Sequence, residues 1–180
     1  MKSFAITLMI AFSGLIAGAQ GTKVSLQASG LTCSMCSKAV LNALQELPNI
    51  EKVTVDIKNQ EYHISFKDDS MADFDALAKA VEDAGFSVAS FKVTTEVKNI
   101  KLEKDQHVLI GNQYFHFLNA DNRQLDGKAS FTIVDKNFTT DKNFKKYSGL
   151  SKMECVQSGK ASSCCSADIK QDTRIYHVII

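Results

Sequence analysis

A Cys-x-x-Cys pair that stands between a strand pattern and a helix pattern is the feature that most constrains this chain. Alternating apolar residues over 24–28 predict a short strand, and an amphipathic helix pattern begins at about Ser34. Cys33 is therefore expected in the strand-to-helix loop and Cys36 in the first helical turn, where residues three apart share a side. Because a helix N-terminus carries partial positive charge, it favours thiolates, and two thiolates so held suit a soft ion of low coordination number, above all Cu(I).

Two other interpretations of a Cys-x-x-Cys pair have to be weighed, half of a zinc site and a redox dithiol. A closed zinc site needs four ligands, and no second Cys-x-x-Cys or His pair stands near enough in sequence to complete one. A thioredoxin-like motif usually has a Trp before it, and this chain contains no Trp. The surrounding pattern therefore has to decide between these chemistries.

The first half of the chain has a strand–helix–strand–strand–helix–strand order, which is a split βαβ pattern. The first helix is predicted over 34–47 and ends at Pro48. Alternating apolar residues predict two strands over 53–57 and 62–66, and a second helix ends at Gly85. This order predicts an α+β unit with both helices on one face of an antiparallel sheet.

Residues 23–93 resemble a heavy-metal-associated domain, the module of copper chaperones, metal-pumping ATPases and periplasmic mercury-binding proteins. The stretch 30–36 (GLTCSMC) parallels the family's Gly-Met-Thr-Cys-x-x-Cys loop, and 83–86 (DAGF) parallels the turn after its second helix. The resemblance implies a ferredoxin-like βαββαβ sandwich in which Cys33 and Cys36 bind the metal. It also implies a partner that is a metal-transporting membrane protein or another metal-binding domain.

The N-terminal residues have the pattern of a secretory signal peptide over 1–19. Lys2 precedes an apolar run, which small residues follow at 17–19. The pattern predicts a periplasmic or secreted protein with no stable membrane insertion after the signal is removed. A charged stretch over 95–105 is interpreted as a linker between the heavy-metal-associated domain at 22–94 and a second domain at 106–180.

The second half shows short β runs and no strong helix pattern, so we expect a small, mostly antiparallel β domain, with an OB-like barrel as one arrangement. Turns are predicted at 111–112 and 126–127. The formal net charge of +1 gives no case for nucleic acid. Strand-surface positions are predicted for the histidines of the chain: His63, His107, His116 and His177.

A polar segment over 151–173 is predicted to be a long loop, and it holds Cys155, Cys164 and Cys165. In an oxidising compartment the simplest interpretation is a disulfide from Cys155 to one of the other two. The alternative is a second soft-metal site, because a vicinal Cys pair bonds to itself only with strain. The five cysteines, an odd number for an exported protein, motivate the further hypothesis that this loop folds towards the Cys-x-x-Cys pair and adds a ligand.

These observations predict a non-enzymatic, exported metallochaperone that binds Cu(I), or another thiophilic ion such as Hg(II), Ag(I) or Zn(II). The ion would pass to a partner by ligand exchange at Cys33 and Cys36. The runner-up is a thiol–disulfide oxidoreductase that uses Cys33 as nucleophile and Cys36 as resolving thiol. A weaker third interpretation is an interaction module in which the β-rich half recognises a partner.

Overall fold

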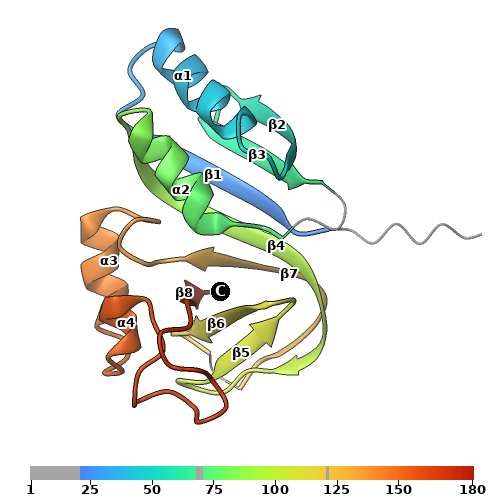
Figure 1. The fold of residues 1–180 in the computed structure, drawn as a ribbon, viewed down its shortest axis with the longest axis vertical. Helices are drawn as coiled ribbons and strands as arrows, with labels where there is room; N and C mark the ends of the chain where they lie inside the picture. The colour runs from blue at the N-terminus through green and yellow to red at the C-terminus, as the bar shows by residue number, and fades with distance from the viewer. Residues whose placement is uncertain (1–20, 68–70, 121) are drawn as a thin grey trace, which may run out of the picture.

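A computed structural model describes residues 21–67, 71–120 and 122–180, which form an eight-stranded sheet and four helices (Figure 1). The predicted signal peptide over 1–19 lies outside the described residues. The elements in chain order are β1 (Lys23–Ser29), α1 (Ser34–Gln45), β2 (Ile50–Asp56), β3 (Glu61–Phe66), α2 (Phe74–Asp83), β4 (Ser87–Lys101), β5 (His107–Ile110), β6 (Gln113–Phe117), β7 (Gln124–Ile133), α3 (Asp141–Ser148), α4 (Cys155–Ser158) and β8 (Ile175–Ile179).

The first half confirms the predicted ferredoxin-like sandwich. Its strands run in the order β2-β3-β1-β4, and each neighbouring pair is antiparallel. Val24, Leu26 and Tyr62 point from this sheet into the core, and Val40 of α1 and Leu77 of α2 meet them there. Both helices therefore bury their apolar stripes on the same face of the sheet, because alternate residues of each strand are apolar on that face alone.

The two helices of this half begin at side-chain caps. Cys33 caps α1, and its sulfur accepts a hydrogen bond from the backbone N–H of Cys36 at 3.2 Å. Asp73 caps α2 in the same way through the N–H of Ala76, at 2.9 Å. Each cap satisfies one backbone donor that the first helical turn leaves unpaired.

Strand β4 continues through most of the stretch that was predicted to be a linker over 95–105. The strand extends to Lys101, and it pairs with β1 along its first part and with β7 along most of its length. Val97 is buried inside this charged stretch, so the strand keeps an inward-facing apolar position. Glu96 and Lys98, on either side of Val97, are exposed, because successive side chains of a strand point to opposite faces.

The strands of the second half extend the same sheet in the order β4-β7-β8-β6-β5. Most pairs are antiparallel as predicted, and β6 and β8 are parallel. The strands form an open continuation of the sheet among the described residues, in place of an OB-like barrel. The prediction of a turn at 126–127 is wrong, since Gly127 lies inside β7 opposite Val97, at a bulge in the pairing of β7 with β4.

One hydrophobic core runs through both halves of the sheet. Phe74 of α2 is 1% exposed, and its ring centroid lies 5.6 Å from that of Phe91 on β4 and 5.3 Å from that of Tyr176 on β8. Phe115 of β6 joins the same aromatic cluster at 6.3 Å. The N-terminal helix layer therefore packs directly on strands from the C-terminal half.

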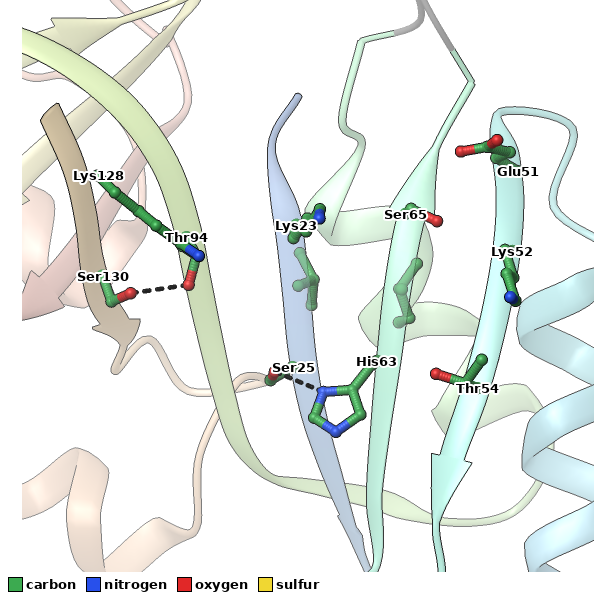
Figure 2. A pocket seen from close by; sticks show the side chains of 12 residues that line it. Lys23, Ser25, Glu51, Lys52, Thr54, His63, Ser65, Thr94, Lys128 and Ser130 are labelled. Atoms are coloured by element: carbon green, nitrogen blue, oxygen red, sulfur yellow. Dashed lines mark hydrogen bonds between the residues drawn. The ribbon is translucent and has the colours of Figure 1, made fainter. Parts of the chain in front are cut away.

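Polar side chains of β1, β3 and β4 line a pocket on the opposite face of the sheet, as Figure 2 shows. His63 is exposed there, as predicted, and its Nδ1 lies 3.0 Å from the hydroxyl of Ser25. Thr94 and Ser130 share a hydrogen bond of 2.8 Å between β4 and β7 on this face. Short polar pairs of this kind need no covering layer.

In the C-terminal half, this same face of the sheet is covered by the segment that follows α3. Cys155, Val156, Ala161 and Ile169 pack there on Ile175 of β8 in a second, smaller apolar cluster. The segment 151–173 is therefore not a structureless loop, because it contains α4 and is tied back by a bridge between Lys160 and Arg174. Within the described part of the chain, no helix has the length and apolarity needed to cross a membrane.

Candidate functional site

The structure brings Cys33 and Cys36 together at the tip of the loop between β1 and α1. Cys33 is exposed and Cys36 is partly exposed, and their Cα atoms lie 5.3 Å apart. Gly30 begins the loop with a φ of +84°, a conformation that glycine adopts without a Cβ penalty. Phe86 lies against this turn, where a Cβ on Gly30 would meet its ring at 3.8 Å.

The two sulfur atoms are bonded to each other as a disulfide in this structure. A disulfide offers no thiolate, so this form of the pair cannot bind a soft cation through two sulfurs. Reduction adds two electrons and two protons and returns two thiols at the N-terminus of α1. The two cysteines can thus act as a redox couple, and in the reduced form they can bind a metal ion through two thiolates.

A groove with a volume of about 460 Å³ lies beside Cys33. Its lining includes the apolar side chains of Leu41 and Val55 and the charged side chain of Lys38. Ile57 on the groove and Met35 between the two cysteines are 86% and 73% exposed. Exposed apolar groups next to a reactive pair form a surface suited to transient contact with a partner.

Cys155, Cys164 and Cys165 also lie together, but far from the Cys-x-x-Cys loop. Their sulfur atoms are all within 4.8 Å of one another. They pack with residues of β6 and β8, whereas Cys33 directly precedes α1, and Figure 1 shows α1 and α4 at different parts of the sheet. The hypothesis that segment 151–173 adds a ligand to the first pair is therefore wrong, because the segment is packed on another part of the sheet.

All three cysteines of this group are free thiols in the structure. The predicted disulfide from Cys155 to Cys164 or Cys165 is thus not formed. Cys155 is fully buried, and Cys164 and Cys165 are partly exposed. Burial raises the pKa of the Cys155 thiol, and the neighbouring sulfur of Cys165 raises it further.

Two histidines that were predicted at the strand surface lie instead beside Cys155. His107 Nε2 is 3.6 Å from Cys155 Sγ, and His116 Nδ1 is 3.9 Å from it. His116 is fully buried and His107 is half-buried, because the segment around α4 covers this end of the sheet. Burial and the neighbouring His177 lower the pKa of His116 to about 4, so its imidazole is neutral at pH 7.

A third histidine, His177, is also buried, which corrects the prediction of a surface position. Its Nδ1 donates a hydrogen bond of 2.7 Å to Asp135 Oδ1. Its ring centroid lies 5.2 Å from that of His116, since the two residues are direct neighbours on β8 and β6. Arg174 pairs with the other oxygen of Asp135 at 2.9 Å, so the carboxylate is held between two partners.

One sequence signal could have found the histidine pair. A tight turn at Gly111 and Asn112 pairs Ile110 with Gln113, and that register places His107 opposite His116. The contribution of Cys155 could not be read in this way. It depends on how a polar segment far along the chain folds back over the strands.

The first half of the structure has the architecture of a small metal-binding α+β module, with paired cysteines at the tip of its first loop. The sequence model of the heavy-metal-associated domain matches residues 25–87. A periplasmic component of mercuric transport from Serratia marcescens is 34% identical over 86 residues, which are 48% of this chain and 93% of that protein. The chain belongs to the heavy-metal-associated domain family.

Other similar proteins are a copper chaperone, a copper-transporting ATPase and a MerP protein of known structure. The copper chaperone CopZ of Bacillus subtilis is 35% identical over 65 residues, which are 36% of this chain and 93% of CopZ. The copper-transporting ATPase HMA4 of Oryza sativa is 32% identical over 78 residues, and the match spans only 8% of its length and 43% of this chain. A crystal structure of oxidized MerP from Ralstonia metallidurans CH34 is 30% identical, with a TM-score of 0.34 over 38% of this chain and 96% of that one.

Proposed function

We propose that this protein is an exported, non-enzymatic carrier of a thiophilic metal ion, above all Cu(I), bound by Cys33 and Cys36. The observation that carries the proposal is the placement of two accessible sulfurs at the start of α1, three residues apart. Its membership of a family that includes copper chaperones and mercuric transport proteins supports the same chemistry. Hg(II), Ag(I) and Zn(II) are the alternative ions for a thiolate pair.

The carrier mechanism follows from a site that uses only two protein ligands. Both thiols lose their protons to solvent when the ion binds, so affinity falls as the pH is lowered. Because the loop is exposed, a thiolate from a partner can attack the ion before either bond to Cys33 or Cys36 breaks. Exchange through such a shared intermediate keeps the affinity high and the transfer fast.

The groove beside Cys33 provides the docking surface in this proposal. The exposed side chains of Met35 and Ile57 supply apolar contact, and Lys38 supplies a positive charge. A matching partner is a metal-transporting membrane protein or another metal-binding domain with an acidic and apolar surface. Export to the periplasm rests on the signal pattern over 1–19, and N-terminal sequencing of the protein from a periplasmic extract tests it.

Metal analysis of the full chain, purified under reducing and oxygen-free conditions, tests the proposal. After loading with Cu(I) in the presence of a competing chelator, we expect one tightly held ion to be lost in Cys33→Ser/Cys36→Ser. The matched control is Ser34→Ala, which changes the same loop and leaves both sulfurs in place. If the double serine variant retained the same copper stoichiometry and affinity, Cys33 and Cys36 would not be the carrier site.

The disulfide between Cys33 and Cys36 favours a second candidate function, thiol–disulfide oxidoreductase. In that function the Cys33 thiolate attacks a substrate disulfide, and Cys36 then attacks the mixed disulfide to release the reduced substrate. Insulin reduction with dithiothreitol as reductant separates the two candidates. Rapid metal-free turnover that Cys36→Ser abolishes would support the enzyme, whereas turnover no faster than dithiothreitol alone supports the carrier.

A further inference from the structure

We infer a second metal site in the C-terminal half, in which His107, His116 and Cys155 bind one zinc or copper(I) ion. The site is separate from Cys33 and Cys36, and it does not depend on the carrier function. Its three ligand atoms come from β5, β6 and the start of α4, and they all lie within 4.8 Å of one another. Imidazole and thiolate ligands both suit these two ions.

The two sulfur–nitrogen separations are close to those of a tetrahedral site. Bond lengths of about 2.3 Å to sulfur and about 2.0 Å to nitrogen place sulfur and nitrogen about 3.5 Å apart, and two sulfurs about 3.8 Å apart. Cys155 Sγ lies 3.6 Å from His107 Nε2 and 3.9 Å from His116 Nδ1. Both sulfur–nitrogen separations are thus close to those that a bound ion requires, and the two nitrogens lie within 4.8 Å of each other.

The surroundings of His116 are those of a metal ligand held by a carboxylate. Its Nε2 lies 3.3 Å from Asp105 Oδ1, which fixes the proton on Nε2 and leaves the Nδ1 lone pair directed towards Cys155. Histidine ligands commonly donate their other N–H to a carboxylate in this way. Asp105 itself has a φ of +57°, a backbone conformation that non-glycine residues seldom adopt.

Cys164 and Cys165 provide two thiols beside the buried site that can bind an incoming ion first. Their sulfurs lie 3.9 Å apart and form with Cys155 a second triad within 4.8 Å, so Cys155 belongs to both groups. Because they are partly exposed and Cys155 is buried, an ion that meets these thiols first can pass inward through Cys155. The Cys155 proton leaves to solvent as the sulfur–metal bond forms.

The first test uses the full chain carrying Cys33→Ser/Cys36→Ser, reduced with a phosphine under nitrogen. After separate loading with Zn(II) and with Cu(I) and desalting, we expect about one ion per chain for one or both metals. Adding His107→Ala should lower the affinity at least tenfold, while His63→Ala, which removes an exposed histidine from β3, should leave it unchanged. Retention of neither ion by the Cys33→Ser/Cys36→Ser protein would overturn the inference.

Cobalt(II) absorption tests directly which side chains bind the metal. Bound cobalt should show thiolate-to-metal charge transfer that disappears in Cys155→Ser and persists in Cys164→Ser/Cys165→Ser, whose loading should be slower. Circular dichroism verifies that Cys155→Ser is folded, and His107→Ala provides the independent ligand test at a half-buried position. A spectrum that depends on Cys164 and Cys165 but not on His107 and Cys155 would refute the assignment.

Discussion

Replacing Phe74 by Ala tests whether the two halves of the chain fold as one unit. Phe74 belongs to the metal-binding module, yet its ring contacts the rings of Tyr176 and Phe115 from the C-terminal strands as well as Phe91. Removing a fully buried Phe costs about 3–5 kcal/mol, since its contacts are lost and a cavity remains. For a chain of this size such a loss lowers the melting temperature by about 10 °C.

Urea unfolding followed by far-ultraviolet circular dichroism measures this change. We expect one cooperative transition in the wild-type protein and one in Phe74→Ala, with the midpoint moved to lower urea and the slope unchanged. The control is Ile57→Ala, because Ile57 is 86% exposed and its loss should change the unfolding free energy by less than about 0.5 kcal/mol. Two separate transitions, or a Phe74→Ala loss below about 1 kcal/mol, would refute the shared core.

Two further predictions concern the loop glycine and the buried histidine. Gly30→Ala should lower the unfolding free energy by about 1–2 kcal/mol in denaturant titrations, because its φ of +84° penalises a Cβ. The control is Gly21→Ala, at an open position without positive φ, which should change the unfolding free energy little. An equal loss in both variants would contradict this reasoning. Metal-free protein should lose stability as the pH falls from about 6.5 to about 4, because burial lowers the pKa of His116 and the unfolded chain binds that proton first. Urea midpoints measured across this range should fall less steeply in His116→Gln, and an identical slope would exclude His116 as the cause.

The first half of the fold could be predicted because its signals are local. Alternating apolar residues at Val24 and Leu26 define the strand that precedes the cysteine loop, and the helix periodicity begins at Ser34, where α1 starts. Pro48 follows the end of α1, as a helix terminator should. Close spacing of Cys33 and Cys36 also follows from sequence, since both sit at one helix start.

The second half could be predicted only at the level of single strands. The runs that became β5, β6 and β8 are visible in the sequence, but the parallel pairing of β6 with β8 joins residues about sixty positions apart. Helix α3 was missed because its eight residues are mostly polar and none is buried. The histidine environment was misjudged because its cover comes from α4, whose position no local pattern encodes.

The attachment of β7 along β4 has a consequence for how this protein meets others. In a four-stranded module β4 would be a bare outer strand with unpaired backbone groups, a template on which other chains can aggregate. Here Phe91 to Lys101 are bonded to β7, so the described sheet ends only at β2 and β5. The C-terminal half thus prevents the β4 edge of the metal-binding module from pairing with strands of other chains. Recognition of a partner near Cys33 then depends on side chains.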